Sequence, residues 1–197
     1  MRKYLFIFLL YFSSLNISYS IEADVFVQST VNRASSILSD NSSKDQKIAE
    51  LKKIAKETVD IEGIGFYTLG SIRKQLNDEQ KKKYSELFEQ YFLKSFSSRL
   101  AEYTNPEIDV FNKEVLSENY TIVNSLLKGT NDRPEVKIDW RIYTKNSQNP
   151  LIRDLIIEGL SLARTQKEEF TSILNSNNND INALFKSLKE FSQNSSN

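Results

Sequence analysis

The chain has 197 residues, with 26 Lys and Arg, 26 Asp and Glu, and neither Cys nor His. The balanced charge argues against a nucleic-acid partner, and the absence of Cys excludes disulfides. The absence of His removes the commonest general base and metal ligand. A chain of this length can fold as one domain with a sizeable hydrophobic core.

The first residues have the three parts of a secretory signal peptide. Arg2 and Lys3 are basic, residues 4–15 form an apolar run, and small polar residues follow. This run is shorter than the ~20 residues that cross a hydrocarbon core. We therefore expect cleavage after Ser20 and export of a single domain over residues 21–197.

Helices are predicted in the first half of that domain. Apolar residues recur at helical spacing over residues 24–38 and 43–58. Residues 59–70 contain three glycines, which suggests short helical pieces joined by tight turns.

The strongest helix pattern begins at Asn77, whose side chain can cap the first free amides while Gln80 reaches back. The helix is expected to reach Tyr103 before Pro106, a length of roughly 39 Å at 1.5 Å per residue. Apolar and aromatic side chains follow one side of it at three-and-four spacing, namely Tyr84, Leu87, Phe88, Tyr91, Phe92, Phe96, Leu100 and Tyr103.

Strands are predicted after Pro106. Residues 108–115 and 120–128 are plausible strands, and in residues 136–142 Val, Ile, Trp and Ile alternate with charged residues, as in a sheet with one wet face. A last strand is expected over residues 152–162, where Gly159 could mark a bulge or a bend.

Two helices, over residues 162–175 and 180–191, are expected to close the chain, with a loose tail after about residue 191. The predicted order is helices, then an antiparallel meander of four strands, then helices again. This order describes an α+β domain with a four-stranded sheet.

Four stretches in this order resemble a known family, the periplasmic phospholipid-binding component of the Mla (maintenance of lipid asymmetry) pathway, also called the toluene-tolerance auxiliary family. Two positions depart from the family's usual Trp, which is replaced by Ile72 and Pro150. The similar stretches are Val59 to Ile64 with Leu69-Gly70, Glu79-Gln80 with Phe88, Ser98 to Tyr103, and Asp154 to Leu162 with Phe170.

The resemblance implies a curved sheet and helices of NTF2-like shape that enclose an apolar pocket. It also implies a carrier with no catalytic activity and no cofactor, whose cargo is a phospholipid. Such a carrier would shuttle lipid through the periplasm between an inner-membrane ABC transporter complex and an outer-membrane lipoprotein–porin complex, and so maintain outer-membrane lipid asymmetry.

The candidate pocket wall combines the long-helix stripe with the predicted strands. The alternative is that the same residues only pack against one another as core. The candidates are Phe66, Leu69, Leu87, Phe88, Tyr91, Phe92, Phe96, Leu100, Tyr103, Val136, Ile138, Trp140, Ile142, Leu155 and Ile157.

Two other functions stay open from the residues. A module of the same shape could bind another apolar ligand, such as a hopanoid. An enzyme is the weaker alternative, because Asp154 and Glu158 on one strand would lie about 13 Å apart. The sequence has no phosphate loop, metal-ligand cluster or serine nucleophile elbow, although a single Asp or Tyr in a cavity could transfer a proton.

Overall fold

The computed structural model describes residues 20–194, so the predicted signal peptide lies almost wholly outside the described residues. The described chain begins and ends in helices and forms its sheet between them. In order, the elements are α1 (Ala23–Ser39), α2 (Lys44–Thr58), α3 (Ile61–Thr68), the 3-10 helix η1 (Gly70–Lys74), α4 (Asp78–Leu100), β1 (Ile108–Ser117), β2 (Tyr120–Leu127), β3 (Val136–Tyr143), β4 (Leu151–Ile157), β5 (Leu160–Ser161), α5 (Leu162–Ser176) and α6 (Ile181–Gln193).

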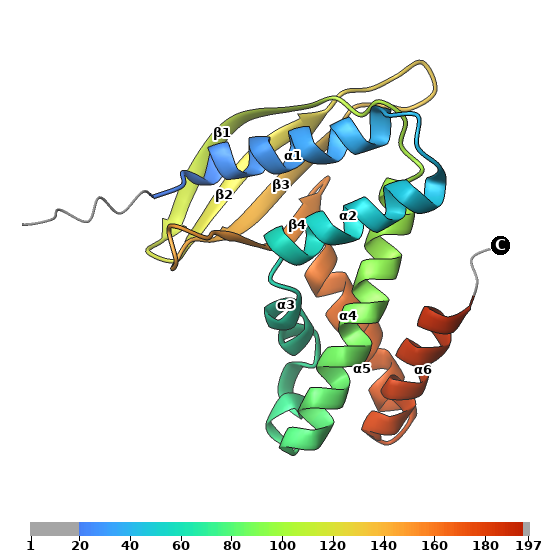
Figure 1. The fold of residues 1–197 in the computed structure, drawn as a ribbon. Helices are drawn as coiled ribbons and strands as arrows, with labels where there is room; N and C mark the ends of the chain where they lie inside the picture. Colours follow the sequence, from blue (N-terminus) through green and yellow to red (C-terminus); the bar gives the residue numbers. More distant parts are fainter. Residues whose placement is uncertain (1–19, 195–197) are drawn as a thin grey trace, which may run out of the picture.

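The molecule has an upper part made of the sheet and α1 and a lower part made of helices (Figure 1). The five strands follow one another in the order β1-β2-β3-β4-β5, and each pair is antiparallel. Helices α3, α4, α5 and α6 run side by side below the sheet, and α2 lies between the two parts (Figure 1). This confirms the predicted α+β architecture, but the sheet has five strands and not the expected four, because the predicted last strand is divided into β4 and β5.

One face of the sheet is apolar because the strands alternate in register. Val123 is paired with Trp140, and Ser125 with Ile138, so these side chains lie on the same face. Ile138 and Trp140 are buried, as the alternation predicted. Helix α1 lies against β1 and β2, which covers only the first half of the sheet.

The predicted start of the long helix is confirmed. Asn77 accepts a hydrogen bond from the Gln80 amide at 2.8 Å, and the Gln80 side chain accepts one from the Asn77 amide at 3.1 Å. This capping box satisfies two amides that a helix start otherwise leaves unpaired. The helix ends at Leu100, not at Tyr103, because the chain turns over the residues that precede Pro106.

The predicted last strand is shorter than expected. β4 ends at Ile157, and the chain reverses through Glu158 (φ 49°) and Gly159 (φ 81°) into the two-residue strand β5. Gly159 therefore marks a bend, one of the two expected possibilities, and its left-handed backbone suits glycine. This reversal sets the direction in which α5 leaves the sheet.

Candidate functional site

The predicted wall residues lie together in the interior. Five are buried, namely Leu69, Phe88, Ile138, Trp140 and Ile142, and the others are half-buried. All but Leu100, Tyr103 and Ile157 belong to one hydrophobic cluster or pack against it. With these three exceptions, the candidate residues of α3, α4, β3 and β4 gather in one cluster, and their contact with a lipid stays a prediction.

An aromatic ladder runs along α4. Phe88 lies 5.7 Å from Tyr84 and 6.2 Å from Phe92, and Phe92 stacks on Phe96 at 5.6 Å with nearly parallel rings, all measured between ring centroids. The Phe170 ring of α5 meets Phe88 edge-on at 6.2 Å. Such pairs add to the stability that burial alone supplies.

On the sheet side of the cluster, the polar N–H group of the Trp140 indole has a hydrogen-bond partner. The Trp140 indole N–H donates to Ser125 Oγ at 2.8 Å, and this hydroxyl donates to the Ile138 carbonyl at 3.0 Å. Ser125 is completely buried. These hydrogen bonds hold Trp140 within the cluster. Trp140 lies on the buried face of β3, as the alternation of apolar and charged residues predicted.

The backbone of α4 comes close to α2, α3 and α6 but approaches no strand to the same extent. Long side chains of α4 and of the sheet nevertheless belong to one cluster. Helix α4 and the sheet are therefore joined through side chains of this cluster, while α2 lies between the two parts of the molecule (Figure 1).

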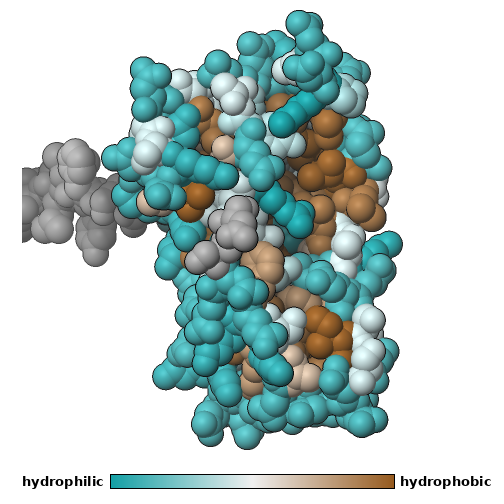
Figure 2. All heavy atoms as spheres, turned by 90° about the vertical axis from the view of Figure 1, so that its right-hand side faces the viewer, coloured by the Kyte–Doolittle hydropathy of each residue, from teal (hydrophilic) through white to brown (hydrophobic). Residues whose placement is uncertain are grey.

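Apolar residues also reach the surface on the side of the molecule that lies to the right in Figure 1. Figure 2 shows them as brown areas among hydrophilic residues, the largest of them in the upper part. Several side chains that pack against the cluster, among them Phe92, Phe96 and Val136, are only half-buried. The apolar interior is therefore not sealed on all sides.

Sequence analysis missed two buried residues of α4, Leu93 and Ser97. Ser97 is fully buried, and its hydroxyl donates to the Leu93 carbonyl at 2.6 Å, so its burial leaves no unpaired polar atom. Leu93 lies next to Phe92 in the chain, so helical spacing could have found it if the apolar stripe had been drawn wider. Ser97 gives no such signal, because serine is usually exposed.

Tyr84 ties α4 to α3 at the base of the cluster. Its hydroxyl lies 2.7 Å from Thr68 Oγ1 and donates to the Gly65 carbonyl at 3.2 Å. Burial raises the pKa of the Tyr84 hydroxyl well above its usual value. Burial, followed by the charge of Glu169, also raises the pKa of Tyr91. Both phenols stay neutral at physiological pH.

Asp154 and Glu158, the two carboxylates considered for acid–base catalysis, do not lie on the same strand. Asp154 is buried in β4, where it accepts from the Ser161 hydroxyl at 2.6 Å and from the Ala163 amide at 3.0 Å. Glu158 lies in the turn beyond the strand, so the predicted placement of both residues on one strand is wrong. Asp154 therefore stabilises the start of α5 through these two hydrogen bonds.

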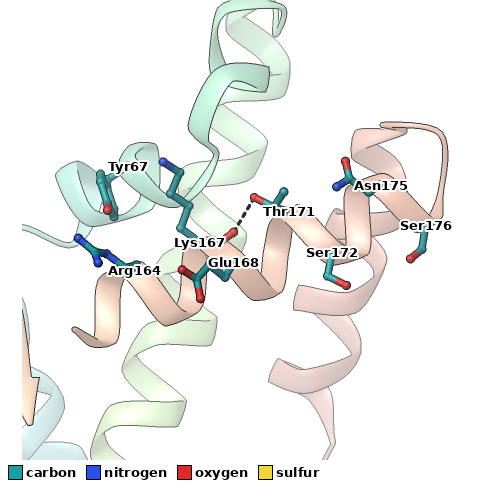
Figure 3. A pocket seen from close by; sticks show the side chains of 8 residues that line it. All are labelled: Tyr67, Arg164, Lys167, Glu168, Thr171, Ser172, Asn175 and Ser176. Atoms are coloured by element: carbon teal, nitrogen blue, oxygen red, sulfur yellow. Dashed lines mark hydrogen bonds between the residues drawn. The ribbon is translucent and has the colours of Figure 1, made fainter. Parts of the chain in front are cut away.

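Two hollows lie beside α3 and α5, away from the predicted wall residues. The larger, of about 680 Å³, runs along α5 and is polar, with Tyr67 of α3 facing Arg164 and Lys167 (Figure 3). The second, of about 430 Å³, is bordered by Tyr67, Leu116, Arg141 and Arg153 among others. None of the predicted wall residues borders either hollow.

The described residues contain no cluster of three or more acidic side chains placed to hold a metal ion. Every buried side-chain nitrogen or oxygen within residues 20–194 has a hydrogen-bond partner. Over the same residues, no helix combines the length and apolarity needed to cross a bilayer.

Fold and interior together define a class, an α+β domain built around an aromatic and aliphatic interior. The chain belongs to the MlaC family, because the sequence profile of the MlaC protein matches residues 28–190. Members of this family are non-enzymatic lipid carriers.

Comparisons with solved structures agree with this family. Seven chains match, including a phospholipid-binding protein from Ralstonia solanacearum that was solved in complex with a phospholipid. That protein has a TM-score of 0.73 and 18% sequence identity, over 87% of this chain and 97% of its own. No curated protein sequence matches significantly.

Proposed function

We propose that the protein is a periplasmic phospholipid carrier that shuttles lipid between outer- and inner-membrane complexes and so maintains outer-membrane lipid asymmetry. The single observation that carries this proposal is the apolar cluster that side chains of α4 share with side chains of the sheet. Membership of the MlaC family supports it, as does the likeness in fold to a protein solved with a phospholipid.

A carrier must hide the lipid tails from water. At about 0.8 kcal/mol per methylene, two acyl chains left in water would cost roughly 20 kcal/mol. The aromatic ladder of Phe88, Phe92 and Phe96 on one side and Ile138 and Trp140 on the other supply apolar surface of the required kind. In this proposal the lipid tails insert between these two walls, and the headgroup stays at the surface.

The tails would enter where the cluster is least covered. The buried residues Phe88 and Ile142 anchor the interior, whereas Phe92, Phe96 and Leu155 are half-buried and can change rotamer at lower cost. Because no strand packs closely on the α4 backbone, acyl chains that enter this cluster exchange contacts between side chains for contacts with the lipid. The free-energy change of loading then stays small, which suits a carrier that must also release its cargo.

The proposed location and partners follow from the amino terminus and the family. Arg2, Lys3 and the apolar residues 4–15 have the pattern of a cleaved export signal. In the periplasm the carrier would dock transiently on an inner-membrane ABC transporter complex and on an outer-membrane lipoprotein–porin complex. The direction of net transport is then set by these partners, since binding itself is reversible.

Vesicle-to-vesicle transfer tests the proposal. Donor vesicles containing a fluorescent phospholipid and a quencher are mixed with plain acceptor vesicles, and fluorescence recovery is followed with and without the protein. We expect recovery to rise in proportion to protein concentration. Recovery equal to the protein-free rate would contradict the carrier role, and selective transfer of a hopanoid analogue would instead favour another apolar cargo.

A further inference from the structure

Strand β1 is an open edge of the sheet. It forms hydrogen bonds with β2 on one side, and within residues 20–194 no other segment pairs with its outer side. Figure 1 shows β1 as the outermost strand, with α1 lying alongside. Unpaired backbone groups on such an edge can accept a further strand.

This edge is also apolar at the surface. Among the described residues, β1 carries three exposed large hydrophobic side chains, Phe111, Val115 and Leu116, with 61%, 71% and 50% of their surface exposed. Irregular pairing occurs between Val110 and Asn112 and between Val115 and Ser117. Phe111 and Leu116 occupy these irregular positions, away from the regular ladder.

Helix α1 extends the apolar surface. Ile21 and Val25, before and within its first turn, are 41% and 59% exposed. The Lys113 ammonium of β1 contacts Glu22 at 2.6 Å and Asp24 at 2.8 Å, so this end of α1 is held against the strand. Exposed apolar patches of this kind mark interaction sites.

The surroundings of the patch are acidic. Lys113 is shared by two carboxylates, which leaves one negative charge in that cluster. At the other end of β1, Lys128 is shared in the same way by Glu107 at 3.1 Å and Asp109 at 3.3 Å. Glu114 and Glu118 add two more carboxylates near the hairpin, and no ion pair in the described chain neutralises them.

We infer that the outer edge of β1 is a docking surface for an extended segment of a partner polypeptide that carries apolar and basic side chains. Strand addition supplies main-chain hydrogen bonds, and apolar side chains of the segment cover Phe111 and Val115. The acidic surroundings favour lysine and arginine in the partner and disfavour both a second copy of this strand and an anionic lipid surface.

A designed peptide tests this inference on the purified protein. The probe is a ten-residue peptide of alternating valine and lysine, and its control has glutamate in place of lysine. We expect the lysine peptide to bind about tenfold more tightly and to shift the β1 backbone amide resonances. Equal binding of both peptides, or shifts confined to other strands, would overturn the inference.

Matched variants locate the surface. Val115→Lys adds a positive charge to the open edge, and Leu160→Lys adds the same charge to β5, where Leu160 is 59% exposed. We expect Val115→Lys to weaken lysine-peptide binding about tenfold and Leu160→Lys to leave it unchanged. Equal effects would overturn the inference, as would a concentration-dependent dimer that Val115→Lys abolishes. Circular dichroism checks that both variants are folded. Lipid transfer is measured in parallel, so a failure here stays distinct from a failure of the carrier role.

Discussion

Gly65 of α3 lies directly against the ring of Phe88. A β-carbon added at Gly65 would come within 2.8 Å of Phe88 Cδ1. Phe88 in turn contacts Tyr84, Phe92 and Phe170 through its ring. The missing side chain of one glycine thus allows the aromatic ladder of α4 to pack against α3.

Replacing Gly65 by alanine should therefore destabilise the protein. Overpacking costs about 1–3 kcal/mol, which exceeds the gain of about 1 kcal/mol in helix propensity. Urea unfolding should show a net loss of up to about 2 kcal/mol for Gly65→Ala. The same substitution should cost less in a Phe88→Leu background, where the ring is absent. Equal costs in both backgrounds would show that the two residues do not interact.

Tyr84 should give the protein an alkaline limit. Its pKa is raised in the folded state by burial, while in the unfolded chain it stays near 10. Stability is therefore fully present below pH 10 and is lost as the pH rises above it, because only the unfolded chain then releases the proton. Chemical unfolding between pH 9 and about 11.5 should show this loss, and Tyr84→Phe should make it less steep. Identical slopes for both proteins would contradict this assignment.

Asp154 should matter for stability rather than for a reaction. Asp154→Ala removes the acceptor of the Ser161 hydroxyl and the Ala163 amide at the start of α5. We expect a loss of about 2 kcal/mol in thermal or chemical unfolding. The exposed Asp132→Ala is the control and should change stability by less than about 0.5 kcal/mol. A loss no larger than that of the control would contradict the capping role.

A charge on the proposed lipid wall should abolish lipid uptake. Phe92→Asp places a carboxylate among apolar side chains, whereas Gln90→Asp places the same charge on the exposed side of the same helix. We expect vesicle transfer to fall at least about tenfold for Phe92→Asp and to stay unchanged for Gln90→Asp. A folded Phe92→Asp protein with full transfer would show that Phe92 is only part of the core.

Local signals in the sequence predicted much of the fold. The capping box of Asn77 and Gln80 lies within four residues, and the alternation around Trp140 follows from the pleat of a single strand. Such features depend on neighbours in the chain. These local signals correctly predicted where α4 starts and which side of β3 is buried.

Features that depend on distant contacts were not predictable in the same way. The burial of Ser97 depends on the packing of α4 against other helices, and the early end of β4 depends on the left-handed turn at Glu158. The separation of α4 from the sheet is a property of the whole fold. The wall residues could be grouped by their apolar character, but not divided into core and lipid contacts.

The most direct test of the carrier proposal is the mass of the purified protein under native and denaturing conditions. We expect a native mass that exceeds the denatured mass by one phospholipid, identified by lipid extraction of the same sample. Protein that is empty as purified, and remains empty after incubation with phospholipid vesicles, would contradict it.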